Sequence, residues 1–98
     1  MAEKLLKSDL IAKARGFTNS IAKMDEKQKG MTPTGEYGND YNNLREIVLR
    51  QYPQLAELLP PSVSLYAGGS GRHYTRQSYS EIDTFCEQII QLLSSRND

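Results

Sequence analysis

The sequence is short of several residue types that commonly define a function. Its 98 residues include one cysteine, one histidine and no tryptophan, and 12 basic side chains balance 12 acidic ones. A single cysteine excludes a disulfide framework within the chain and favours a reducing compartment, so we expect a cytoplasmic protein. Zero net charge also argues against a nucleic-acid backbone as the main partner, because such proteins carry an excess of positive charge.

Long apolar runs are missing as well. A membrane-spanning helix needs about 20 consecutive apolar residues, and a secretion signal needs a continuous apolar core. The region 1–31 is mildly basic, with 7 basic against 4 acidic residues. Its lysines alternate with acids, unlike the cationic face of a membrane-surface helix. We therefore expect no membrane association.

Apolar residues recur at helical spacing in three stretches. The range 79–94 has the broadest apolar face and follows a capping-box pattern, Ser78 with Glu81. The range 4–27 carries a stripe with steps of four and three residues: Leu6, Leu10, Ala14, Phe17, Ile21 and Met24. The range 40–51 follows Asn39 or Asp40 as a cap and stops before Pro53, after which a short helical turn is expected over 54–59.

Two glycine-rich segments, 28–38 and 67–77, predict flexible loops. Residues 62–66 alternate polar and apolar like a half-buried strand, but a lone strand makes no sheet, so we expect an extended segment over the helices. The sequence thus predicts an all-α single domain over 1–98. We expect a small three- to four-helix bundle with a glycine-rich loop before the C-terminal helix.

No constellation of residues indicates catalysis. The segment from Gly68 to Arg72 is glycine-rich but lacks the lysine and the hydroxyl residue of a phosphate-binding loop. His73 is the only histidine, so it has no second histidine to share a metal, and Cys86 lies within an apolar stripe, where burial makes a thiol inert. We predict no catalytic residue, no metal site and no cofactor, and hence no enzyme.

Candidate binding residues come from one compact group and from the tyrosines. Arg72, His73, Tyr74 and Arg76 combine cationic and aromatic side chains just before a helix start, where they can bind an anion or stack on a partner. The chain has 6 tyrosines. Tyrosine suits protein interfaces, and those expected in loops, Tyr37, Tyr66 and Tyr74, are the candidates for an exposed surface.

These observations predict a non-enzymatic helical interaction or regulatory module that binds another protein or itself as a homo-oligomer. The alternative is a small nucleic-acid-binding regulator that uses the basic first helix or the loop 72–76. Neutral overall charge argues against that alternative.

Overall fold

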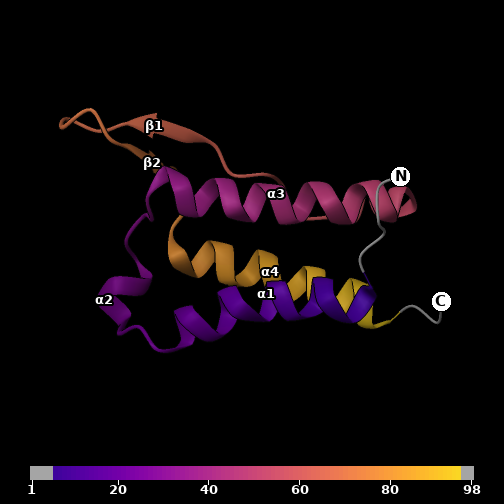
Figure 1. The fold of residues 1–98 in the computed structure, drawn as a ribbon. Coiled ribbons are helices and arrows are strands. Elements are labelled where there is room, and N and C mark those ends of the chain that lie inside the picture. Colours follow the sequence, from indigo (N-terminus) through magenta and orange to yellow (C-terminus); the bar gives the residue numbers. More distant parts are fainter. Residues whose placement is uncertain (1–5, 96–98) are drawn as a thin grey trace.

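The computed structural model describes residues 6–95 (Figure 1). Over this range the chain is mostly helical, with four α-helices and a small two-stranded sheet, so it is not purely α. The helices are α1 (Lys7–Ala22), α2 (Glu26–Lys29), α3 (Gly35–Gln51) and α4 (Tyr79–Ser94), and the remaining elements are a 3₁₀ turn η1 (Pro53–Leu55) and the strands β1 (Leu65–Ala67) and β2 (His73–Thr75).

The three long helices lie side by side, and the β1–β2 hairpin projects beyond one end of them (Figure 1). Helix α1 packs most extensively on α4 and also contacts α3. The apolar stripes that the sequence predicts meet in one core, whose fully buried members include Leu10, Ala14, Ile21, Tyr41, Val48, Ile82, Cys86, Ile89 and Leu93. None of the helices in the described range has both the length and the apolarity needed to cross a bilayer.

Helix α4 has the bounds that the sequence predicts and begins with the predicted capping box. The backbone N–H of Glu81 donates to the Ser78 hydroxyl at 3.2 Å, and the Ser78 N–H donates to the Glu81 carboxylate at 3.2 Å. These bonds satisfy two of the backbone groups that a helix start leaves unpaired.

The expectation of one helix over 4–27 needs correction, although residues 4 and 5 lie outside the described residues. Helix α1 ends at Ala22, and α2 starts afresh at Glu26. The interruption has a local cause, because Asp25 has an extended backbone and forms its own capping box with Gln28. A second cap within a helical stripe marks a second helix start.

Helix α3 begins five residues before the expected start at 40, inside the segment 28–38 that was expected to be flexible. Thr34 is its N-cap, with its hydroxyl 3.5 Å from the Tyr37 backbone nitrogen. Gly35 and Gly38 lie in the first two turns, where they are packed under β2. A Cβ added to Gly35 would lie 3.1 Å from the His73 Cβ. These glycines allow two segments to approach closely and do not form a turn.

The segment expected to be a flexible loop at 67–77 instead contains β2, and the strand pattern over 62–66 finds its partner there. Leu65, Tyr66 and Ala67 of β1 pair antiparallel with Thr75, Tyr74 and His73 of β2. On its other side β2 meets the chain before α3, through a bridge between Thr34 and Tyr74 and a 2.9 Å bond from the Thr75 N–H to the Pro33 carbonyl.

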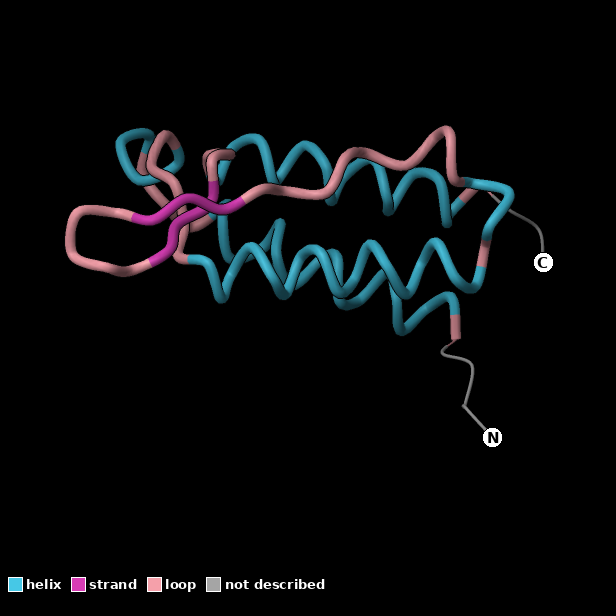
Figure 2. The backbone as a smooth tube through the Cα atoms, turned by 90° about the horizontal axis from the view of Figure 1, so that it is seen from above, coloured by secondary structure: helices cyan, strands magenta, loops and turns pink. Residues whose placement is uncertain are grey.

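The segment that leads back to the hairpin is fixed along α3. After α3, only Pro53–Leu55 forms 3₁₀ helix, which is shorter than the turn expected over 54–59. The chain then runs back along the helices (Figure 2). The Arg45 Nε donates to the Pro60 carbonyl at 2.6 Å, and the Tyr41 hydroxyl donates to the Pro61 carbonyl at 2.9 Å.

Asn42 completes this attachment with two bonds. Its side-chain amide donates to the Val63 carbonyl at 3.0 Å, and its side-chain oxygen accepts from the Val63 N–H at 2.8 Å. The amide therefore takes the place of a neighbouring strand at Val63.

Two helical glycines predict opposite responses to alanine. In Gly38→Ala the new methyl group would collide with the Thr75 methyl group and lie 3.1 Å from a Val63 methyl carbon, whereas in Gly16→Ala nothing lies within 4 Å. We expect Gly16→Ala to raise the free energy of unfolding by about 0.5–1 kcal/mol. Gly38→Ala should lower it by about 1–3 kcal/mol, because the overpacking outweighs the same helix-propensity gain.

Urea denaturation followed by circular dichroism measures both values, and Gly16→Ala serves as the matched control. Stabilisation by both substitutions would contradict the close packing of β2 on α3.

Candidate functional site

The outer face of the hairpin brings three of the predicted binding residues together. Tyr66 and Tyr74 are direct cross-strand partners, with ring centroids 6.1 Å apart and ring planes 36° apart. The guanidinium carbon of Arg76 lies 5.6 Å from the centre of the Tyr66 ring, a cation–π distance. We call these three side chains the tyrosine–arginine face.

The local sequence explains why these side chains share a face. Arg76 directly follows β2, and its N–H continues the pairing with the chain before β1 by donating to the Ser64 carbonyl. Its side chain therefore points the same way as that of Tyr74, two residues earlier, and Tyr66 is paired opposite Tyr74. Gly68 makes room for the Tyr74 ring, because a Cβ there would lie 2.8 Å from a ring carbon. The Tyr66 hydroxyl reaches to 3.5 Å from the Thr32 hydroxyl.

The inner face of the hairpin holds it against α3. Thr75 is fully buried, and its hydroxyl donates to the Gln77 carbonyl at 2.6 Å. Its methyl group packs on Gly38, and His73 packs on Gly35. Thr75 thus anchors the inner face, on which Leu65 is half-buried and Ala67 and His73 are exposed, while Tyr66 on the outer face is 36% exposed.

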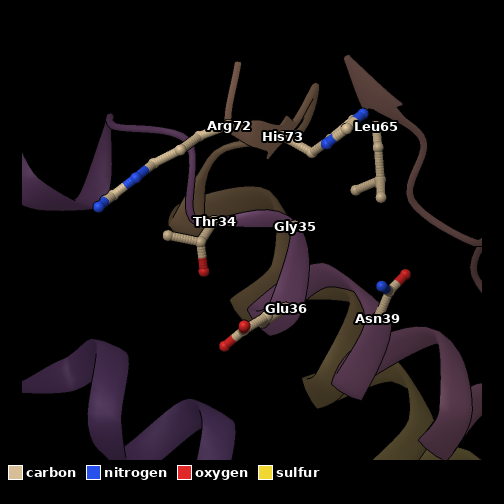
Figure 3. A pocket seen from close by; sticks show the side chains of 7 residues that line it. All are labelled: Thr34, Gly35, Glu36, Asn39, Leu65, Arg72 and His73. Atoms are coloured by element: carbon tan, nitrogen blue, oxygen red, sulfur yellow. The ribbon is translucent and has the colours of Figure 1, made fainter. Parts of the chain in front are cut away.

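A hollow of about 700 Å³ lies between the inner face of the hairpin and the start of α3. In Figure 3 the His73 ring lies beside the Leu65 side chain, and the Arg72 side chain extends away on the other side, over Thr34. The residues that line the hollow are Thr34, Gly35, Glu36, Asn39, Leu65, Arg72 and His73. Arg72 and His73 are therefore near the tyrosine–arginine face but belong to this hollow.

The hairpin segment itself carries charge of one sign. Residues 58–80 contain Arg72 and Arg76, together with the chain's only histidine, and no aspartate or glutamate. The acids nearest in sequence are Glu57 and Glu81, and Glu36 reaches the hollow from α3. A protein with no net charge thus carries a local basic surface.

Tyr37, the sixth predicted binding residue, is not in a loop and is not part of the hairpin surface. It lies in the first turn of α3, edge-on to Phe17 at 5.3 Å and to Tyr79 at 5.2 Å. Its hydroxyl is buried without a hydrogen bond of good geometry, although Ser20 is close enough to lower the pKa slightly. Burial dominates and raises the pKa of Tyr37 to about 12.

Cys86 and Ser78 both have structural roles. Cys86 is fully buried, and burial raises its pKa to about 12, which suppresses the thiolate at neutral pH. Ser78, the serine that lies five residues after His73, caps α4. Among residues 6–95, no three His, Cys, Asp or Glu side chains group together in a way that could hold a metal ion.

The sequence did not predict three of the residues that line the hollow, namely Leu65 of β1 and Glu36 and Asn39 of α3. Two signals pointed to them. The alternation over 62–66 indicated a strand containing Leu65, and the spacing of Gly35 and Gly38 marks a helix face that another segment approaches closely.

Comparisons of this chain with protein-family models, with curated proteins and with solved structures find no match.

The buried tyrosines and the buried cysteine predict a fall in stability at alkaline pH. Burial raises the pKa of Tyr37 and of Cys86 to about 12, from ordinary values of 10.0 and 9.0, and raises the pKa of Tyr41 further. The unfolded chain therefore releases these protons first as pH rises, and these three groups should leave the free energy of unfolding unchanged up to about pH 8. It should then fall between about pH 9 and pH 12, by at most about 1.4 kcal/mol per pH unit for each group.

Urea unfolding at a series of pH values measures this effect, and two phenylalanine variants separate its parts. Tyr37→Phe removes a hydroxyl without a good hydrogen bond, so it should change stability at pH 7 by less than about 0.5 kcal/mol and make the alkaline loss smaller. Tyr41→Phe removes the bond to Pro61 and should cost about 1 kcal/mol at pH 7. Equal costs at pH 7 would contradict this assignment.

Proposed function

We propose that this protein is a non-enzymatic interaction module that docks another protein on the hairpin. The single observation that carries the proposal is the tyrosine–arginine face, in which two paired tyrosines and one arginine lie together on a strand pair whose other face is anchored to α3 by the buried Thr75. Tyrosine and arginine are the side chains most enriched at the energetic centres of protein interfaces. A face already held in position loses little conformational freedom on binding.

The proposal also covers the domain that carries the hairpin and the compartment in which it acts. We propose that residues 1–98 form one cytoplasmic domain, in which α1, α3 and α4 pack as a three-helix bundle that carries the hairpin. The contacts of α1 with both other long helices support the bundle, and the burial of the sole cysteine supports a reducing compartment.

Variants of the exposed face test the docking proposal. Tyr66→Ala and Arg76→Glu change residues outside the buried core, so we expect the far-ultraviolet circular dichroism and the unfolding midpoint to stay close to wild type. Quantitative affinity capture from the native cell should show partners whose recovery falls at least tenfold with either variant.

Leu58→Ser is the matched control for this experiment, because Leu58 is 62% exposed but lines a separate hollow beside α4. Partners retained by Leu58→Ser and lost with both hairpin variants support the proposal. Recovery that is the same for all four proteins would overturn it.

A nucleic-acid-binding regulator is the second candidate, and the acid-free stretch over 58–80 with its paired tyrosines is the observation that favours it. Stacked bases and a cationic groove are the usual means of holding single strands. Fluorescence anisotropy with a labelled oligouridine and with a labelled duplex should then show affinity that decreases as salt rises and that Tyr66→Ala weakens. Affinity that is absent, or that does not change with salt, would remove this candidate.

A further inference from the structure

Strand β1 has one paired edge and one open edge. The Arg76 N–H donates to the Ser64 carbonyl at 2.9 Å, and the Gly68 N–H donates to the Arg72 carbonyl at 2.6 Å. Hydrogen-bonded and non-hydrogen-bonded pairs alternate along an antiparallel ladder. Tyr66, midway between these two bonded positions, therefore faces β2 as well, and Leu65 and Ala67 direct their backbone N–H and C=O groups away from it.

Before β1 begins, the backbone groups on this same outward edge of the chain already have hydrogen-bond partners. Val63, two residues before Leu65, has both of its backbone groups bonded to the Asn42 side chain. On the far side of β2, the Thr75 N–H donates to the Pro33 carbonyl, and Tyr74 forms a bridge with Thr34. Within residues 6–95, the outward N–H and C=O groups of Leu65 and Ala67 have no hydrogen-bond partner. We call these four groups the open edge.

The open edge lacks the features that usually keep a strand edge from pairing. Residues 58–71 contain no charged side chain, and β1 contains no proline. Exposed edges are normally protected by lysine, proline, a bulge or a covering loop. Here the short length of β1 is the only such protection among the described residues.

We propose that the open edge of β1 receives an extended segment of a partner protein as an additional strand, with acidic side chains at alternate positions. This inference rests on the proposed docking function and names the mode of binding. In such strand addition the backbone bonds provide affinity, and the side chains of alternate residues provide specificity.

The surroundings of β1 determine which side chains fit. Alternate residues of an added strand point to opposite faces of the sheet. Those on the inner face lie on the side of the half-buried Leu65 side chain, against which an apolar side chain can pack. Those on the outer face lie on the side of the tyrosine–arginine face, where Arg76 is the charged group. The hairpin carries no acid, so acidic side chains complement its charge.

A second copy of this chain is a poorer occupant. Pairing β1 with another β1 would unite two three-residue strands and bring together two hairpins of the same basic charge. Like charges brought together at an interface oppose association. Self-association is therefore an outcome that the experiment must separate from peptide binding.

The test starts from a displayed library of random nine-residue peptides, selected on the wild-type protein. We expect enriched sequences in which acidic residues alternate with apolar ones. Convergence on basic or non-alternating sequences, or no convergence, would overturn the inference.

The strongest selected peptide is then synthesised and used as the probe in an amide hydrogen-exchange measurement by NMR. The Leu65 and Ala67 amides should exchange quickly in the free protein and at least tenfold more slowly with bound peptide. The Tyr66 amide, which already faces β2, should change much less. A peptide that binds without slowing the Leu65 and Ala67 amides would overturn strand addition.

Ala67→Pro removes one outward N–H without removing a bond between β1 and β2, so it should weaken peptide affinity at least tenfold. Ala67→Val keeps the N–H and is the matched control, with affinity expected within about threefold of wild type. Equal binding by both variants would overturn the inference. The inference would also be overturned if sedimentation showed that the wild-type protein is a dimer and that Ala67→Pro dissociates it, because the open edge would then bind a second copy of the chain.

The exchange measurement on the wild-type protein decides the matter if Ala67→Pro disturbs the hairpin. Failure of the inference can also be told apart from failure of the proposed function. If Tyr66→Ala and Arg76→Glu lose cellular partners while the exchange of Leu65 and Ala67 is unaffected by peptide, docking stands and strand addition does not.

Discussion

The close approach of β2 to α3 is the contact on which the candidate surface depends. Gly38 leaves space for the methyl group of the buried Thr75, and Gly35 leaves space for His73. Side chains at these two positions would push the hairpin away from the helix. Because the inner face is thus anchored, Tyr66, Tyr74 and Arg76 are presented on the outer face in a fixed arrangement.

A second set of contacts places the hairpin along the length of the helix. Tyr41, Asn42 and Arg45 bond the backbone of Pro61, Val63 and Pro60, so the returning chain follows α3 over more than one turn. The last of these attachments is the pair of hydrogen bonds between the Asn42 side chain and the Val63 backbone, two residues before β1 begins. Beyond that point the same edge of the chain has no partner among the described residues, which is why β1 has an open edge.

Periodicity and capping made much of the helical part predictable. The stripe over 79–94 and the Ser78–Glu81 box describe α4 correctly, because a broad apolar face and a cap both depend on local sequence. The stripe over 4–27 identified Leu10, Ala14 and Ile21 as core residues, but Leu6 is 67% exposed. The stripe also extended past the end of α1, since periodicity alone does not detect a second cap such as Asp25.

The hairpin was less predictable, because glycine has two structural uses that the sequence does not distinguish. Gly71 has a φ of +84° and serves the turn between the strands, whereas Gly35 and Gly38 are helical and serve close packing. The residues Arg72, His73, Tyr74 and Arg76 were recognisable as a group by composition. Their division between an outer face and a hollow depends on strand register, which required the pairing with β1.

The two ends of the hairpin are joined to different helices. Before β1 the chain is bonded along α3, and only two residues separate Thr75 at the end of β2 from Ser78, the cap of α4. A force applied to the hairpin is therefore transmitted to both α3 and α4. A protein held there would keep a constant orientation relative to the helical body, and the hairpin would transmit torque as well as tension.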